Sequence, residues 1–247
     1  MLFKEFGNRN SKTIILVHGG GLSWWGYKSV AELLEKDYHV VTPVIDGHGE
    51  DADNTFISIE ASAKKLIEYI DSAHGGKVFA IAGLSLGAQI LTEVLSLRND
   101  ITEFAIIESA LVLPIRGTAT MASANKLLYG LIKQKWFSKM QAKSMAVPKE
   151  MFEFYYDDSI RMSKQSLINI TLSNGNYYVK PTLSETKAKA LIIVGNNEIG
   201  IMKKSASKLI EAILESKLYI AEDMRHGELS LVHPQKYIGL LKTFFED

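Results

Sequence analysis

The chain has 247 residues, of which 47% are hydrophobic, and it contains no cysteine. This composition is that of an ordinary globular protein and excludes a disordered or fibrous chain, and the lack of cysteine excludes disulfides, thiol nucleophiles and thiolate metal sites. Lys plus Arg and Asp plus Glu each number 28, so the formal net charge is zero and no global field favours nucleic acid or a membrane surface.

The N-terminal segment, residues 1–12, carries charges from Lys4 onward and lacks the apolar core of a secretory signal peptide. Nowhere does the chain approach the run of about 18 apolar residues that a membrane-spanning helix needs. We therefore expect a cytoplasmic protein without stable membrane insertion and without a nucleic-acid partner. The sequence leaves the oligomeric state open.

The N-terminal half alternates short β-branched runs with helical patterns. Residues 13–17 form a buried-strand pattern that ends at a run of glycines, and residues 38–41 form a second one that ends at Pro43. Ser58 can cap a helix whose apolar residues recur at helical spacing until Gly75. The segment before the first run leaves room for one leading strand.

The same alternation returns towards the C-terminus. Strand patterns fall at residues 77–82, 104–107, 190–194 and 217–220, and helical patterns fall at 88–97, at 203–214 and from Pro234 onward. Because strands that alternate with helices pair in parallel, this order predicts an α/β fold with a mostly parallel, doubly wound sheet covered by helices on both faces.

The alternation is interrupted between residues 111 and 187. This stretch is rich in methionine and aromatic residues at helical spacing, and it contains no convincing strand pattern. We predict a helical cap at residues 111–187, inserted between two late strands of a core that residues 1–110 and 188–247 form. No repeat, low-complexity run or flexible linker marks a freely hinged second domain.

The charge of this region differs from that of the whole chain. Residues 109–149 contain no Asp or Glu but seven Lys and Arg, which gives a local charge of +7, and four acidic residues follow between 150 and 158. One interpretation is a solvated helix face balanced by these acids. The other is a basic lid that receives an amphipathic substrate with an anionic end, or that contacts anionic lipid.

The strongest chemical signal is the sequence Gly83-Leu84-Ser85-Leu86-Gly87, which stands between a predicted strand and a predicted helix. A serine at such a sharp turn takes a strained backbone conformation that only small flanking residues allow, and its hydroxyl is exposed at a helix N-terminus. The alternative is a glycine-rich turn whose serine caps the helix. We favour the first interpretation, in which Ser85 is a nucleophile.

Four further segments follow predicted strands and match one known family in order and spacing. They are His18-Gly19-Gly20-Gly21, Asp46-Gly47-His48-Gly49, Gly195-Asn196-Asn197-Glu198 and Arg225-His226-Gly227. With the serine turn, they make the chain resemble the α/β-hydrolases over nearly its whole length. The second segment is a shortened and altered form of the family's turn, with Asp51 where a serine is usual.

This resemblance implies a catalytic triad of Ser85, Glu198 and His226, in the chain order that the fold uses. Serine needs a base to take its proton, a role for His226, and the imidazole needs a carboxylate to hold it, a role for Glu198. Glu198 stands where the family usually has Asp, so Glu108, at the end of another predicted strand, is an alternative acid. His233 is an alternative to His226, but its place directly before a proline favours packing or capping.

The expected oxyanion-hole donors are the backbone N–H groups of Leu86 and Gly20, with Gly21 as the alternative to Gly20. The sequence contains no P-loop, no dinucleotide fingerprint and no histidines at zinc spacing, so we expect no cofactor and no metal. We expect His18 and His48 to shape loops without transferring protons. His39 and His74 are expected to lie at the surface.

These features together predict a serine hydrolase of the carboxylesterase type. It would cleave an apolar or amphipathic small-molecule ester of a small to medium apolar acyl group through an acyl-enzyme. Other chemistries of the fold remain alternatives: C–C bond hydrolase, thioesterase, lactonase, acyltransferase or lyase. A non-catalytic ligand-binding homologue is an alternative of a different class, which the competent residues at all three triad positions disfavour.

Overall fold

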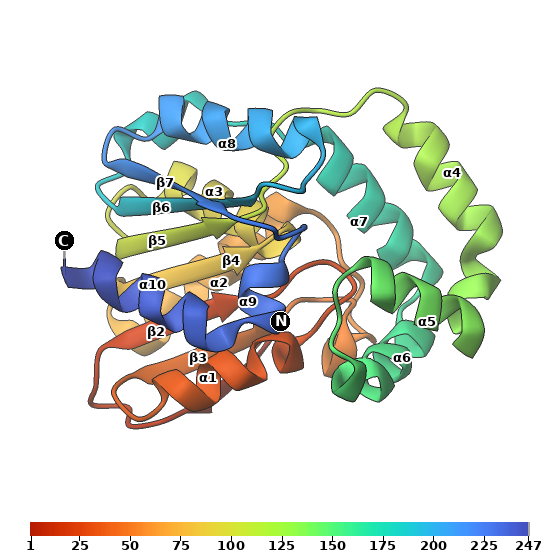
Figure 1. Cartoon of the computed structure of the whole chain (residues 1–247), viewed down its shortest axis with the longest axis horizontal. Helices are drawn as coiled ribbons and strands as arrows, with labels where there is room; N and C mark the ends of the chain where they lie inside the picture. The colour runs from red at the N-terminus through yellow and green to blue at the C-terminus, as the bar shows by residue number, and fades with distance from the viewer. Residues whose placement is uncertain (247) are drawn as a thin grey trace.

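The computed structural model describes residues 1–246, and a seven-stranded sheet forms its centre (Figure 1). The order across the sheet is β1-β3-β2-β4-β5-β6-β7, and every neighbouring pair is parallel except β1 with β3. The strands are β1 (Leu2–Phe6), β2 (Thr13–Val17), β3 (His39–Val44), β4 (Val78–Leu84), β5 (Thr102–Glu108), β6 (Lys189–Gly195) and β7 (Ser216–Ala221). The predicted doubly wound sheet and its leading strand are thus confirmed.

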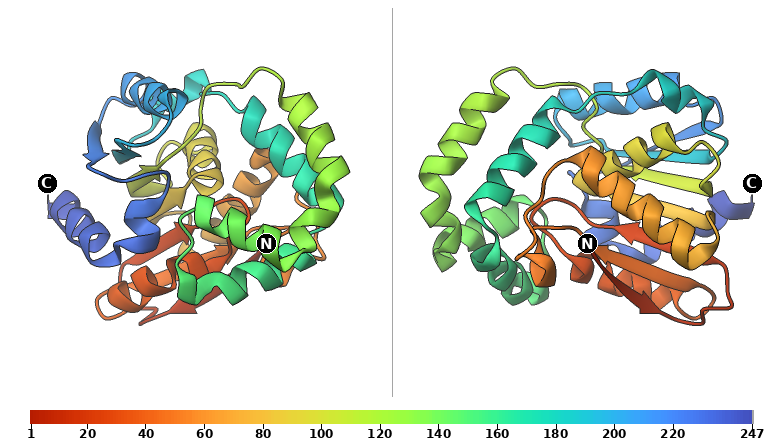
Figure 2. Two further views of the ribbon diagram at one scale, coloured as in Figure 1. Left: turned by 45° about the vertical axis from the view of Figure 1, so that its right-hand side comes forward. Right: turned by 180° about the vertical axis from the view of Figure 1, so that it is seen from behind.

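Helices cover both faces of the sheet, as Figures 1 and 2 show. Adjacent residues of one strand point into different cores: Ile14 packs on one side of the sheet and Ile15 on the other. One core includes residues of α2 (Ile59–His74), α3 (Leu86–Leu97) and α8 (Gly200–Ala212), and the other includes residues of α1 (Lys28–Leu34), α9 (Glu228–Val232) and α10 (Pro234–Glu246). This double burial explains why the strand sequences are continuously apolar.

Helix α2 begins and ends where the sequence predicts. The Ser58 hydroxyl accepts a hydrogen bond from the N–H of Ala61 at 3.1 Å and so caps the first turn. Gly75 closes the helix in the left-handed conformation, with φ of 65°.

The second predicted strand is longer than its sequence pattern indicates, since β3 continues through Pro43 to Val44. Pairing of β3 with β2 ends at Val41, and beyond that residue β3 pairs only with β1, where proline is tolerated as it is at a sheet edge. His39, expected at the surface, is buried, and its ring contacts the Thr13 hydroxyl at 3.2 Å and the Glu5 carboxylate at 3.1 Å. These two polar partners make the burial of the imidazole tolerable.

The stretch between β5 and β6 is helical, and the described structure places no strand in it. Its helices lie beyond the C-terminal ends of the strands, on the right in Figure 1. They are α4 (Thr118–Leu128), α5 (Lys135–Ser144), α6 (Phe152–Arg161) and α7 (Lys164–Asn176). Short 3₁₀ helices span Trp24–Tyr27, Gly49–Asp51, Tyr129–Lys133, Lys149–Met151 and Pro181–Glu185. Across residues 1–246, no helix combines the length and the apolarity that crossing a bilayer would require.

Candidate active site

Ser85 occupies the sharp turn between β4 and α3. Its backbone has φ of 53° and ψ of −111°, a conformation that costs energy for any residue with a side chain. The flanking glycines permit the turn: a Cβ on Gly83 would lie 2.4 Å from the carbonyl oxygen of Gly87, and one on Gly87 would lie 2.1 Å from that of Val17. The turn therefore holds the hydroxyl of Ser85 at the carboxyl edge of the sheet.

A continuous chain of hydrogen bonds joins Ser85, His226 and Glu198, which come from three different loops. The Nε2 atom of His226 lies 2.9 Å from the Ser85 hydroxyl, and its Nδ1 atom lies 2.8 Å from a carboxylate oxygen of Glu198. The side chain of His226 is 45% exposed, whereas that of Glu198 is 1% exposed. A buried carboxylate thus holds an imidazole that remains partly exposed.

Two donors besides the imidazole set the charge of Glu198. Burial opposes its ionisation, but hydrogen bonds from His226, from the Gly195 N–H at 2.9 Å and from the Ser109 hydroxyl at 2.7 Å together lower the pKa of Glu198 below its ordinary value of 4.5. Ser109 also accepts a hydrogen bond from the Gly227 N–H at 3.3 Å, next to His226. Ser109 was not among the residues predicted from the sequence, although its position two residues after a predicted strand, at the same sheet edge as Ser85, was a usable signal.

The alternative residues Glu108 and His233 lie outside this chain of hydrogen bonds. Glu108 is buried at the end of β5, where its carboxylate accepts a 3.3 Å hydrogen bond from the N–H of Ser230. His233 follows α9, and its N–H bonds to the carbonyl oxygen of Leu229 at 3.2 Å. The structure thus brings Glu198, rather than Glu108, into contact with His226.

The burial of Glu108 has a measurable consequence for stability. Burial raises the pKa of Glu108 from 4.5 to about 7, so the folded protein holds this proton more tightly than the unfolded chain does. The resulting stabilisation is complete below pH 4.5 and is lost as the pH rises through 7. Its full size is at most about 3 kcal/mol.

We therefore expect Glu108→Gln, which cannot ionise, to remove this pH dependence. The free energy of unfolding of the unchanged protein minus that of the variant should fall by up to about 3 kcal/mol between pH 4 and pH 8. Urea unfolding of both proteins at a series of pH values measures the difference, in which contributions from other titrating groups cancel. A difference that does not change with pH would contradict the expectation.

A pocket of about 300 Å³ opens beside Ser85 and His226. Its wall is mostly apolar and comes from the loop after β2 and from the helices between β5 and β6; it includes Gly20, Gly21, Ile132, Gln141, Met145, Tyr155, Ser159, Met162, Leu167, Ile170 and Asn174. The N–H of Leu86 belongs to the first turn of α3, where no carbonyl oxygen of the same helix is available to accept it. Within residues 1–246, the N–H groups of Gly20 and Gly21 make no hydrogen bond either.

His18 and His48 are buried, neutral side chains. Burial lowers the pKa of His18 to about 3 and that of His48 to about 4. The Nε2 atom of His18 accepts the N–H of Ile45 at 3.1 Å, so its Nδ1 carries the proton and donates to the carbonyl oxygen of Gly19 at 2.9 Å. His18 thereby links the loops after β2 and β3.

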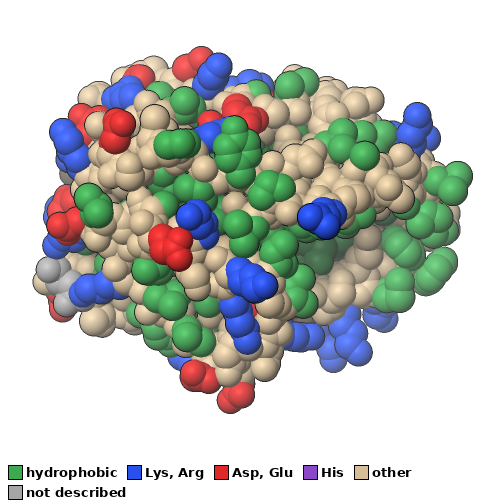
Figure 3. All heavy atoms as spheres, turned by 90° about the horizontal axis from the view of Figure 1, so that it is seen from above, with side chains coloured by type: hydrophobic (Ala, Val, Ile, Leu, Met, Phe, Trp, Pro, Cys, Tyr) green, Lys and Arg blue, Asp and Glu red, His purple; other side chains and the backbone are tan. Residues whose placement is uncertain are grey.

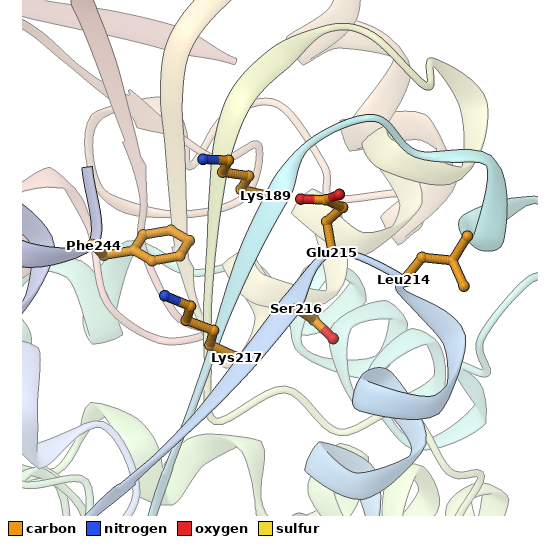
Figure 4. Close-up of a pocket in the computed structure, with 6 residues that line it drawn as sticks. All are labelled: Lys189, Leu214, Glu215, Ser216, Lys217 and Phe244. Atoms are coloured by element: carbon orange, nitrogen blue, oxygen red, sulfur yellow. The ribbon is translucent and has the colours of Figure 1, made fainter. Parts of the chain in front are cut away.

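Another surface hollow, also of about 300 Å³, lies at the opposite ends of the strands (Figure 4). Its residues include Lys189 and Ser216, the first residues of β6 and β7, with Phe244 from α10. It is therefore separate from the group around Ser85. Within the part of the chain that the structure describes, no three His, Asp or Glu residues are placed to hold a metal ion.

Comparison with known proteins gives the same fold over the whole chain. A (E)-2-((N-methylformamido)methylene)succinate hydrolase from Acinetobacter baylyi is 20% identical over 252 aligned residues, which cover 98% of this chain and 93% of that protein. A bromoperoxidase from Bacillus anthracis superimposes with a TM-score of 0.83 at 17% identity, over 99% of this chain and 95% of that one. An esterase from Exiguobacterium antarcticum gives 0.81 at 17% identity, with the same two coverages.

The family profile agrees with these likenesses. The profile of the alpha/beta hydrolase family matches residues 14–226, from the second strand to the histidine beside Ser85. That range includes the serine turn, Glu198 and all the helices between β5 and β6. The chain belongs to the alpha/beta hydrolase family.

Proposed function

We propose that this hydrolase cleaves carboxylic esters of small to medium apolar acyl groups through a covalent acyl-enzyme on Ser85. The observation that carries the proposal is the hydrogen-bond chain from Ser85 through His226 to Glu198, at 2.9 and 2.8 Å. A serine hydroxyl becomes a useful nucleophile only when a base in contact with it accepts its proton, and this chain supplies that base and the carboxylate that orients it.

The reaction would run in two halves. As the Oγ atom of Ser85 attacks the ester carbonyl carbon, its proton passes to Nε2 of His226, and the N–H groups of Leu86 and Gly20 bind the oxyanion. The bond to the leaving alcohol then breaks, and the alcohol oxygen takes the proton from His226. Water repeats the sequence on the acyl-enzyme and releases the carboxylic acid and free Ser85.

The volume and lining of the pocket beside Ser85 suit a small to medium acyl group. Its volume of about 300 Å³ is at the lower end for small-molecule sites, and residues such as Met162 and Ile170 give it an apolar wall. We assign residues 111–187 as a cap over a core made of residues 1–110 and 188–247, because nine of the thirteen residues that line the pocket lie between residues 132 and 174. Acyl-chain selectivity would then depend on the cap.

Hydrolysis of p-nitrophenyl esters from acetate to laurate tests the proposal. We expect kcat/KM to reach its maximum at a chain shorter than about eight carbons and to fall for laurate, because the longer chain exceeds the pocket. A kcat/KM that rises steadily to laurate would contradict the assigned pocket. Lack of turnover of every ester would contradict ester hydrolysis itself.

The second candidate function is another chemistry of the same fold. The relative from Acinetobacter baylyi supports this candidate, because that protein's name describes hydrolysis of a methylenesuccinate derivative. C–C bond cleavage, thioester or lactone hydrolysis, acyl transfer and lyase reactions could use the same three side chains. Covalent labelling of Ser85 by a fluorophosphonate separates all of these from a non-catalytic ligand-binding protein, since labelling needs an activated serine. Labelling without ester turnover would favour this second candidate.

A further inference from the structure

A basic groove adjoins the pocket that contains Ser85. It has a volume of about 600 Å³, twice that of the catalytic pocket, and lies between the end of α5, the following segment and α9. Ala142, Val147 and Phe152 give it an apolar floor, and Lys139, Lys143, Lys149 and Arg225 surround that floor. The space-filling view in Figure 3 shows a hollowed face on which hydrophobic side chains lie among Lys and Arg.

Neighbouring residues of the same two segments line the groove and the pocket beside Ser85, called the catalytic pocket below. Gln141 and Met145 line the catalytic pocket, whereas Ala142 and Ala146, which follow each of them directly, line the groove. On the other side, Arg225 lines the groove and the next residue, His226, lines the catalytic pocket. A ligand in the groove therefore lies against the imidazole side of the site.

The groove has more positive charge than its own side chains neutralise. Lys139, Lys143 and Lys149 are exposed, and none of them forms an ion pair among residues 1–246. The single acid in the lining, Glu228, is already paired with Arg225 at 3.3 Å. Lys139 and Lys143 are one helical turn apart on α5, so their ammonium groups share one side of the groove. An apolar floor with unpaired cations around it is complementary to an amphipathic anion.

The reaction geometry indicates which part of a substrate would enter the groove, an argument that rests on the proposed function. The leaving oxygen must lie near Nε2 of His226, because it takes the proton that His226 received from Ser85. The apolar pocket on the oxyanion side, beside Gly20, suits the acyl chain. The leaving group must then extend past His226 towards Arg225, which lies in the groove.

We propose that the basic groove binds the leaving group of the substrate, and that this leaving group is an alcohol carrying a carboxylate or a phosphate. The substrate is then an ester with an apolar acyl end and an anionic alcohol end. On cleavage, the bond between the acyl carbon and the alcohol oxygen breaks, and the anionic alcohol leaves with a proton from His226. The lysines act by binding and do not touch the reacting atoms.

Matched esters test this assignment. Butyrate esters of 4-hydroxybenzoate and of its neutral methyl ester differ in one charge on the leaving group, and the mono-p-nitrophenyl ester of glutaric acid carries its charge on the acyl side. We expect a preference for the charged leaving group, which added salt weakens. The variant Lys139→Gln/Lys143→Gln/Lys149→Gln should lower the ratio of kcat/KM for charged over neutral leaving groups by about tenfold, because exposed ion pairs contribute about twofold to fivefold each.

A second triple variant, Lys126→Gln/Lys133→Gln/Lys164→Gln, makes the same change in net charge at exposed lysines outside the groove and should leave the ratio unchanged. An equal fall in both variants would show a general field and overturn the proposal. A fall in kcat/KM of the groove variant that is confined to the ester with the charged acyl group would also overturn the proposal. The butyrate ester of 4-hydroxyphenyl phosphate distinguishes the two anions: a larger loss than for the carboxylate indicates a phosphate leaving group, and a smaller loss indicates a carboxylate.

Binding provides a readout that does not depend on turnover. Calorimetry should show that 4-hydroxybenzoate and 4-hydroxyphenyl phosphate bind to the Ser85→Ala variant. Adding the three groove substitutions to that variant should weaken this binding by about tenfold. If no ester is hydrolysed but this binding and its loss are found, the proposed function fails and the anion site stands. If esters are hydrolysed but neither the ratio nor the binding depends on the groove lysines, the anion site fails and the proposed function stands.

Discussion

Replacing Ser85 with alanine is expected to lower kcat for ester hydrolysis by about 10⁶-fold, to a residual rate that comes from substrate binding and the oxyanion site alone. Alanine keeps the Cβ atom and therefore the strained turn, with its φ of 53°, so the fold should persist while the nucleophilic oxygen is lost. Steady-state kinetics on the best p-nitrophenyl ester measure the loss, and the melting temperature checks the fold.

The behaviour of paired substitutions sharpens this expectation. His226→Ala should cost nearly as much as Ser85→Ala, and the double variant should cost little more than either one, because the two side chains act as one unit. The matched control is Ser207→Ala. Ser207 is exposed on α8, and its hydroxyl donates a hydrogen bond to the carbonyl oxygen of Lys203. Fluorophosphonate labelling that survives in Ser85→Ala, or activity that survives in both single variants, would contradict the assignment of the nucleophile.

The strands and the serine turn could be predicted because their causes are local. Continuous β-branched runs indicate strands buried on both faces, and the two glycines that flank Ser85 allow the close backbone contacts that such a sharp turn requires. The turn lies where the sequence places it, although α3 begins at Leu86, two residues before the predicted start. Those two residues matter, because they bring the N–H of Leu86 to the free end of the helix.

The choice between Glu108 and Glu198 depends on structure that no local pattern encodes. Both residues follow strands of the same parallel sheet, so both were expected at the same edge, and only the course of the loops decides which one meets His226. Glu108 lies directly at the end of β5 and turns inward to Ser230, whereas Glu198 lies three residues beyond β6 and reaches the imidazole. The hydroxyl of Ser109 then fills the space between the two loops.

The sequence likewise does not predict which faces of the helices between β5 and β6 line a pocket and which face solvent. Basic, aromatic and methionine residues are interleaved there, and the pattern is compatible with a solvated face and with a ligand-binding face. Only the structure separates the residues of α5 by their surroundings, with Gln141 beside the catalytic pocket and Lys143 in the groove. The positive φ of Ala146, 55°, turns the chain after α5 and could not be expected from an alanine.

Glu198→Gln is expected to lower kcat by about 10⁴-fold, although it preserves the shape of the side chain. One carboxylate oxygen of Glu198 accepts hydrogen bonds from Ser109 and Gly195, so the amide oxygen of glutamine would take that position and its NH₂ group would face His226. Nδ1 of His226 would then have to accept a hydrogen bond, which moves the ring proton to Nε2 and prevents that atom from accepting the proton of Ser85.

The matched control for Glu198 is Glu108→Gln, the same chemical change at a buried carboxyl that does not contact the imidazole. Its hydrogen bond from the N–H of Ser230 can persist with an amide oxygen, so kcat at pH 7 should change by less than about threefold, as for a side chain outside the reacting group. Kinetics of both variants on one ester make the comparison, with unfolding by urea as the check on the fold. A large loss of kcat in Glu108→Gln together with a small one in Glu198→Gln would reassign the triad acid to β5, and comparable losses in both would mean that the two carboxyl groups act together on His226.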